Sequence, residues 1–270
     1  MPLYHLILIA LIQGITEFLP VSSSGHLILL PSLTGLEDQG LVIDVAAHIG
    51  TLCAVMIYFW SDVCLTLQGI SQVLRGRFNA RPARLLIALA IATVPVISAG
   101  LIFKLTGLSG AMRSITVIGW AMLGFGILLY WIDQKAQTQR KMDDLTWRDA
   151  FVLGLWQAMA LIPGTSRSGI TITGALWAGF TRKEAARISV LMSIPTIFAS
   201  GALTALELIG GTVPLRDTAI VITFSFGAAL MALSLMMRLL NSVSYTPYVI
   251  YRVLLGLALL AIGYSGSLGF

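Results

Sequence analysis

Pro20-Val21-Ser22-Ser23-Ser24-Gly25 interrupts a long apolar stretch, residues 3–31, near the start of the chain. A second break of the same kind, Pro163-Gly164-Thr165-Ser166-Arg167-Ser168-Gly169, divides residues 150–180. Each break leaves two apolar pieces of roughly 10 to 17 residues, whereas a helix that crosses a bilayer needs about 20. Irregular backbone at membrane depth is tolerated only where protein or water surrounds it. The two regions are therefore predicted to form re-entrant helix-loop-helix hairpins, each entering and leaving on one side of the bilayer.

The composition around these breaks is that of a membrane protein. The chain has 270 residues, of which 57% are hydrophobic and 11% charged, and its mean hydropathy is +0.90. A soluble protein of this size cannot bury so much apolar surface in one core. Soluble, fibrous and disordered classes are therefore excluded. Six uninterrupted apolar segments are long enough to span the bilayer, namely residues 41–60, 84–103, 114–132, 188–209, 219–240 and 248–264.

The longest polar stretch, residues 133–149, separates two halves of similar layout, residues 1–132 and 150–270. Each half holds one broken hairpin followed by three spanning segments. Because three crossings is an odd number, the second half must be inverted relative to the first. We therefore predict a single all-α membrane domain, with six transmembrane helices and two re-entrant hairpins in an inverted repeat. The polar tips of the hairpins are expected to meet near the midplane, where discontinuous helices form binding sites.

The basic residues agree with this layout. Thirteen of them fall on one face of the predicted topology: Arg75, Arg77, Arg81, Arg84, Lys135, Arg140, Lys141, Arg148, Arg182, Lys183, Arg187, Arg238 and Arg252. The other face has Lys104, Arg113 and Arg216. The positive-inside bias makes the first face cytoplasmic and leaves both termini periplasmic. In this interpretation Arg252 is an interfacial anchor near the cytoplasmic end of the last helix, and the net charge of +5 indicates no nucleic-acid partner.

The first tip combines a carboxylate with hydroxyl groups. Gln13 and Glu17 are four residues apart and share one helix face. Glu17 lies one turn before the break. Ser22, Ser23 and Ser24 begin the next helix, where free N–H groups and the helix dipole favour an anion. This tip is therefore predicted to offer a base beside an anion-binding turn.

The second tip contributes Arg167, the one Lys or Arg that falls outside the loops. An ionisable side chain at that depth is a functional candidate. A guanidinium grips phosphate, a carboxylate serves as general base, and the imidazole of His26 serves as acid or nucleophile. Phosphoryl transfer needs mainly positioning and charge neutralisation, so the sequence predicts chemistry on a phosphate carried by a lipid. Asp44 and His48, four apart on the first spanning segment, are interpreted as a structural pair, with a second site as the alternative.

Residues Gln13-Gly14-Ile15-Thr16-Glu17-Phe18-Leu19-Pro20-Val21-Ser22-Ser23-Ser24-Gly25-His26 resemble the first signature of the bacterial undecaprenyl-diphosphate phosphatases, also called bacitracin-resistance proteins. Pro163-Gly164-Thr165-Ser166-Arg167-Ser168-Gly169 resembles their second signature, and the likeness spans essentially the whole chain. The resemblance implies hydrolysis of undecaprenyl diphosphate to the monophosphate and inorganic phosphate in the bacterial inner membrane. That step recycles the lipid carrier of peptidoglycan synthesis and confers bacitracin resistance. The site is expected to open to the periplasm.

The resemblance also assigns roles to residues. The catalytic set is Glu17, Ser23, His26 and Arg167, and the substrate-binding set is Gln13, Ser22, Ser24, Ser166 and Ser168. Family members are stimulated by divalent cations, so Mg²⁺ or Ca²⁺ is expected, with Glu17 as its ligand. Gln13 stands where other members have Glu, which leaves Glu17 as the single carboxylate. The nucleophile, whether serine, histidine or water, is left open.

A different class of function uses the same architecture. Inverted halves with broken helices are also how secondary transporters bind anions at the midplane. A transporter or flippase of a phosphate-bearing lipid is therefore the alternative, and it would need Arg167 but no base. A non-catalytic scaffold would leave Arg167 unexplained. A homodimer is left open, because the chain has no Gly-x-x-x-Gly motif to define a dimer face.

Overall fold

The computed structural model describes the whole chain except residues 36–38, 109–111, 113, 208–213 and 266–270. The end of the predicted segment 188–209 and the cation Arg113 lie outside the described residues. The described part is all-helical apart from turns and one isolated bridge. Among the described residues, six helices are long and apolar enough to span a membrane: α3 (Gly40–Tyr58), α5 (Arg81–Thr106), α7 (Ile115–Lys135), α10 (Arg182–Glu207), α11 (Leu215–Leu239) and α12 (Thr246–Ser265). The predicted fold class and its six spanning helices are confirmed.

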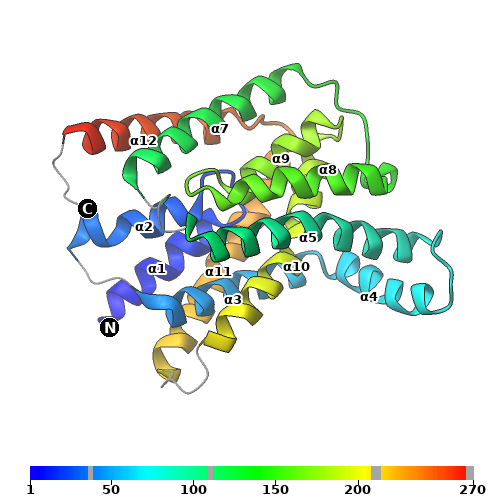
Figure 1. Ribbon diagram of the computed structural model, residues 1–270, viewed down its shortest axis with the longest axis horizontal. Coiled ribbons are helices and arrows are strands. Elements are labelled where there is room, and N and C mark those ends of the chain that lie inside the picture. Colours follow the sequence, from blue (N-terminus) through cyan, green and yellow to red (C-terminus); the bar gives the residue numbers. More distant parts are fainter. Residues whose placement is uncertain (36–38, 109–111, 113, 208–213, 266–270) are drawn as a thin grey trace.

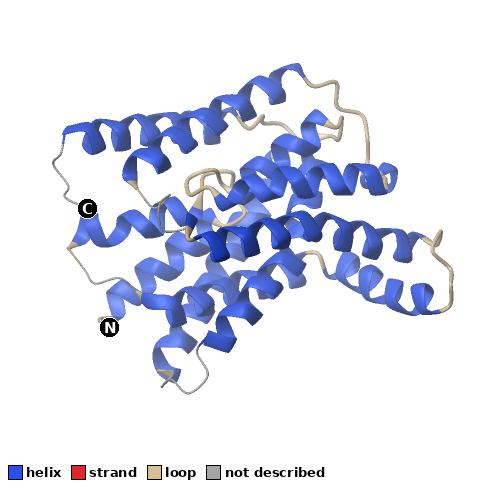
Figure 2. Ribbon diagram, viewed as in Figure 1, coloured by secondary structure: helices blue, strands red, loops and turns tan. Residues whose placement is uncertain are grey.

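Two pairs of shorter helices correspond to the predicted hairpins. The first pair is α1 (Leu3–Thr16) and α2 (Ser23–Thr34), and the second is α8 (Trp147–Ala158) and α9 (Arg167–Trp177), with a 3₁₀ turn between them. At 1.5 Å per residue, helices of 11 to 14 residues cannot cross a bilayer. The pairs approach from opposite ends of the long axis, and Figure 2 shows their loops together among the helices (Figures 1 and 2). Their re-entrant path through a bilayer stays a prediction.

Helix packing exchanges partners between the two halves. In the first half, α1 packs against α11 of the second half, and α8 of the second half packs against α5 of the first. The pairs α7–α12 and α3–α10 also join one half to the other. Reciprocal contacts of this kind are what a twofold relation between halves produces. The packing therefore supports the prediction of an inverted repeat.

A further helix, α4 (Trp60–Leu74), was not predicted. It follows α3 after a break at Phe59, and at 15 residues it is shorter than a membrane span. Its apolar side chains recur at helical spacing, as Val63, Leu67, Ile70 and Leu74. In the first turn of α4, the carboxylate of Asp62 accepts a hydrogen bond from Nε of Arg187, a residue of α10, at 2.9 Å. A search for long apolar runs misses this helix because polar residues occupy much of it.

Ion pairs fasten the helix ends on the side of the α7–α8 connection. Arg182 Nε donates to the buried carboxylate of Asp133 at 2.6 Å, which joins α10 to α7. Asp149 completes a capping box with Thr146 at the start of α8 and accepts from Arg140. Burial raises the pKa of the Asp149 carboxyl, but the hydrogen bonds from Arg140 and Thr146 outweigh burial and lower it below its ordinary value. These contacts fix the start of α8, and so they help to position the turn that follows this helix.

Close packing on α11 brings α1 and α3 together. A Cβ atom at Gly14 would lie 2.6 Å from Ala228 Cβ, and one at Gly50 would overlap the side chain of Ser225. Only glycine permits both helices to approach α11 so closely. Gly14 near the end of α1 and Gly50 in the middle of α3 thus contact the same helix. Because His48 lies two residues before Gly50, the packing of α3 on α11 places His48 near the end of α1.

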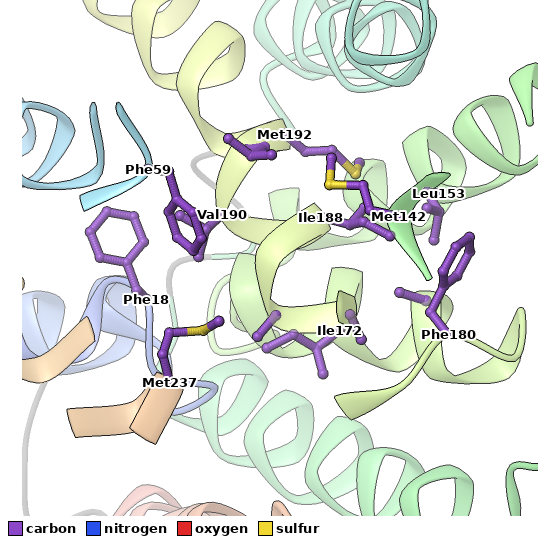
Figure 3. Packing of buried hydrophobic residues seen from close by; sticks show 14 of the residues in the cluster. Phe18, Phe59, Met142, Leu153, Ile172, Phe180, Ile188, Val190, Met192 and Met237 are labelled. Carbon is purple, nitrogen blue, oxygen red and sulfur yellow. The ribbon is translucent and has the colours of Figure 1, made fainter. Parts of the chain in front are cut away.

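The turn after α1 is anchored in the main core. Phe18 is 1% exposed and belongs to a cluster drawn from several helices, in which Figure 3 shows Phe59 and Met237 as its neighbours. Burying a phenylalanine stabilises a fold by about 1.5–3 kcal/mol. Glu17, the residue before Phe18, is therefore held in place by the core beneath it.

Candidate active site

Glu17 is the point where the two tips meet. Its Oε1 accepts a hydrogen bond from Arg167 Nη2 at 2.7 Å, across 150 positions of sequence. Its Oε2 accepts from Ser23 Oγ at 2.7 Å and from Gln13 Nε2 at 2.9 Å. The carboxylate is buried, at 6% exposure. The structure thus brings together the predicted base, the predicted serine and the predicted phosphate-binding arginine.

The two turns share an uncommon backbone conformation. Ser22 and Ser166 have φ values of 74° and 69°, and they are the non-glycine residues with positive φ in the described part of the chain. Each is the N-cap of its helix, and its hydroxyl accepts from the amide three residues later. A left-handed non-glycine residue costs about 1–2 kcal/mol. Because Ser22 and Ser166 are both N-caps, Ser23 and Arg167 are the first residues of α2 and α9. Both side chains form a hydrogen bond with Glu17.

Arg167 keeps a donor free for a ligand. One terminal nitrogen, Nη2, binds Glu17, whereas the buried Nη1 makes no hydrogen bond with the described residues. Buried N–H groups of a guanidinium are nearly always paired. Arginine pairs most strongly with planar anions and phosphate oxygens. The unpaired Nη1 therefore indicates an anion-binding position beside Glu17.

The hydroxyl groups of the other predicted binding serines are mostly used within the turns. Ser168 Oγ donates to the Leu19 carbonyl at 2.8 Å and so ties one turn to the other. Ser166 Oγ lies 3.2 Å from Ser168 Oγ, and Ser22 Oγ lies 3.4 Å from Ser24 Oγ. Ser24 is the exposed member of the set. Contact of these serines with substrate stays a prediction.

His26 lies at the tip, and its ring pairs with Ser22 and with Tyr251 of α12. Its Nδ1–H donates to the Ser22 carbonyl at 2.7 Å, so in the neutral ring Nε2 accepts from Tyr251. The two rings are stacked, with their centroids 5.6 Å apart. Both ring nitrogens are therefore engaged before any substrate binds, and the catalytic role of His26 stays a prediction.

Arg252 overturns one interpretation from the sequence. The side chain is fully buried, at 0% exposure. Its guanidinium donates to five carbonyl groups, those of Pro20, Ala121, Met122, Gly164 and Thr165. The prediction of an interfacial anchor was wrong. The two turns leave the carbonyls of Pro20, Gly164 and Thr165 outside helices, and a five-donor side chain pairs with them and with two carbonyls of α7. Arg252 thus links the two turns to each other through their carbonyl groups. Without Arg252, twelve basic residues remain on the face assigned as cytoplasmic.

His48 also has a different position from the one expected. Its Nδ1–H donates to the Asp44 carbonyl one turn earlier, at 2.8 Å. Its Nε2 lies 4.0 Å from Glu17 Oε2. The sequence interpretation of Asp44 and His48 as a structural pair therefore accounts for Nδ1 only. The polar i,i+4 pair on an otherwise apolar spanning helix had singled out His48 from the sequence, but it gave no indication that Nε2 lies near Glu17.

A large apolar cavity reaches this imidazole. It has a volume of about 1010 Å³ and lies between α3, α4, α5 and α10. Its wall is almost entirely apolar and includes Leu52, Cys53 and Phe198, with Asp44 and His48 among its few polar residues. Pockets of this kind bind apolar ligands and use a few polar groups to orient them. The cavity therefore offers space for an alkyl chain whose polar end lies near His48.

The described residues do not form a metal site of their own. No group of three His, Cys, Asp or Glu side chains with metal-binding geometry occurs among them. The carboxylate of Glu17 already accepts from Arg167, Ser23 and Gln13. This donor set does not fit a protein-held Mg²⁺ or Ca²⁺, which prefers several oxygen ligands, so no step below is routed through a cation.

The fold and the site together define a multi-pass α-helical membrane protein with a buried Glu17–Arg167 pair where two helix tips meet. The family model described as bacitracin resistance protein BacA matches residues 6–258. The chain belongs to this family.

Three relatives that align with nearly the whole chain are named undecaprenyl-diphosphatase. A protein of Ruegeria pomeroyi named undecaprenyl-diphosphatase is 62% identical over 267 residues, which cover 98% of this chain and all of that relative. A protein of Dinoroseobacter shibae with the same name is 60% identical over the same shares. One of Hahella chejuensis, also so named, is 44% identical over 95% of this chain and 96% of its own length.

Proposed function

We propose that this protein is an undecaprenyl-diphosphate phosphatase, which hydrolyses the lipid diphosphate to the monophosphate and inorganic phosphate. The observation that carries the proposal is Glu17, with Ser23 on one oxygen and Arg167 on the other. Full-length relatives named undecaprenyl-diphosphatase support the same activity. The reaction recycles the lipid carrier for peptidoglycan synthesis and deprives bacitracin of its target.

The site geometry gives each group a role. Arg167 Nη1 and the N–H groups at the start of α2 and α9 bind the terminal phosphate. Glu17 takes the proton of Ser23, whose hydroxyl already points at the carboxylate at 2.7 Å. The serine oxygen attacks the terminal phosphorus, and the bond from that phosphorus to the bridging oxygen breaks. Water then hydrolyses the phosphoserine, so that one water is consumed and one phosphate released.

The lipid tail is assigned to the cavity between α3, α4, α5 and α10. This cavity has apolar walls and reaches His48, which faces Glu17 at 4.0 Å. A smaller cavity of about 490 Å³ between α1, α11 and α12 reaches Leu19 but none of the ionisable residues at the tips. The larger cavity is therefore the better path, because its lining includes His48, whose Nε2 lies 4.0 Å from Glu17.

The membrane orientation and the remaining partners are also proposals. The protein is a multi-pass membrane protein, and we assign it to the bacterial inner membrane. Most basic residues lie in or close to the α4–α5, α7–α8, α9–α10 and α11–α12 connections, so we place these connections in the cytoplasm. The N-terminus and the end of α12 lie at the opposite end in Figure 1, and the site would open to that periplasmic side. A divalent cation, Mg²⁺ or Ca²⁺, and a homodimer both stay predictions.

The proposed activity is tested with the purified protein in detergent. Incubation with a long-chain isoprenyl diphosphate should release inorganic phosphate and leave the isoprenyl monophosphate. A wild-type protein that binds this lipid but releases no phosphate would contradict the proposal. The transporter alternative would then be favoured, and Glu17→Gln would leave lipid binding and transfer between leaflets intact.

Cys53 provides a probe of the tail cavity. Cys53 lines that cavity, whereas Cys64 on α4 does not. In Cys64→Ser protein, we expect a bulky maleimide on Cys53 to raise KM for the long-chain substrate at least tenfold, because the label fills space needed by the tail. Bound substrate should slow the labelling. The matched control is Cys53→Ser protein labelled at Cys64, which should keep its activity; inhibition of the control alone would place the tail elsewhere.

A further inference from the structure

His48 presents one ring nitrogen to the site, and the backbone fixes which one. The Asp44 carbonyl accepts from Nδ1–H at 2.8 Å, so Nδ1 carries a proton in both charge states of the ring. Nε2 is then the nitrogen that gains or loses a proton. It lies 4.0 Å from Glu17 Oε2, beyond direct hydrogen-bond distance. A single oxygen atom, of the substrate or of water, can lie within hydrogen-bond distance of both this nitrogen and the carboxylate.

The other imidazole at the tips has no such freedom. Nδ1 of His26 donates to the Ser22 carbonyl, and Nε2 pairs with the Tyr251 hydroxyl. A proton donor to the substrate must have a nitrogen that points at the reacting atoms. The third histidine, His5, lies in the first turn of α1, away from the tip. Geometry therefore favours His48 among the three histidines.

The position of His48 also matches a particular atom of the substrate. The terminal phosphate binds at Arg167 and Ser23, and the tail occupies the cavity that His48 lines. The oxygen that bridges the two phosphates lies between these two ends of the molecule. His48 stands between them as well, because it contacts the cavity and faces Glu17. Its Nε2 is therefore placed beside the bridging oxygen.

We propose that His48 is the general acid of this reaction, which donates its Nε2 proton to the bridging oxygen as the bond to the terminal phosphorus breaks. This inference depends on the proposed phosphatase function. The lipid monophosphate leaves with that proton, while Glu17 holds the proton taken from Ser23. Glu17 passes its proton back to His48 across the 4.0 Å gap through a water molecule. Glu17 is then ready to activate the water that hydrolyses the phosphoserine.

The test measures kcat and KM for release of phosphate from a long-chain isoprenyl diphosphate. His48→Gln keeps a polar side chain of similar reach but cannot donate a proton from an imidazolium. We expect kcat to fall about a hundredfold, the usual contribution of general acid catalysis, with KM within about twofold of wild type. His48→Ala should be equally slow, and added imidazole should restore part of its rate. His5→Gln is the matched control and should keep wild-type kcat.

The outcomes distinguish the role of His48 as general acid from the phosphatase activity on which it depends. Phosphate release by wild type together with wild-type kcat in His48→Gln overturns the role of His48 and leaves the phosphatase assignment standing. No release by wild type overturns the phosphatase assignment itself. Loss of activity in both His48 variants without rescue by imidazole assigns His48 a structural role. Rescue establishes the proton-donor role even if the variants are less stable, because imidazole cannot repair a misfolded protein.

Discussion

Replacement of Arg167 by methionine is expected to lower kcat/KM by at least about a thousandfold, the range found for arginines that stabilise phosphoryl transfer. The same change should destabilise the fold by about 3 kcal/mol, because it leaves the buried Glu17 carboxylate without its cation. Glu17 is 5% and Arg167 17% exposed at the side chain, so water compensates little. Phosphate release and the midpoint of thermal unfolding in detergent measure the two effects.

The double variant Glu17→Gln/Arg167→Met separates stability from chemistry. Removal of both charges of a buried ion pair is often nearly neutral, in contrast to removal of one. We therefore expect its unfolding midpoint to return close to that of wild type while phosphate release stays lost. If the double variant regains activity along with its stability, neither residue takes part in the reaction.

Replacement of Arg252 by methionine is expected to lower both stability and activity although the residue touches no substrate. Its guanidinium serves carbonyls of both turns, including Pro20 at 3.4 Å and Thr165 at 2.8 Å. Each buried carbonyl left unpaired costs about 1–3 kcal/mol. Loosened turns would displace Glu17 from Arg167, and a shift of about 1 Å at a catalytic group costs roughly a hundredfold in rate. Unfolding midpoints and kcat report the two losses.

Two further variants define what Arg252 contributes. Arg252→Lys keeps the charge but has three donors, so we expect it to retain activity between wild type and Arg252→Met. Arg238→Met removes an exposed arginine from the end of α11 and should change stability by less than about 0.5 kcal/mol. Wild-type kcat in Arg252→Met protein would show that the turns hold their geometry without it.

The six spanning helices and the two broken regions were predictable because hydropathy is a local property of the chain. A run of about 20 apolar residues must form a helix in a bilayer, and a Pro-Ser-Gly interruption must end one. Glu17 and Arg167 were also identifiable, because an ionisable residue flanked by apolar helix stands out without any structure. Helix α4 was not predicted, because its apolar residues recur every three or four positions with polar residues between them, as in a surface helix, and form no long apolar run.

The sequence by itself determined the membrane class, the number of spanning helices and which ionisable residues lie at the two tips. Only the tertiary structure decided that Arg252 binds the carbonyl groups of both turns and that His48 lies 4.0 Å from Glu17. Arg252 reaches Pro20 across 232 positions and Thr165 across 87. The partner of a buried polar group depends on which distant segments pack beside it, and no local pattern encodes that. Glycines such as Gly14 and Gly50 allow that approach, but their role becomes visible only once the helices are assembled.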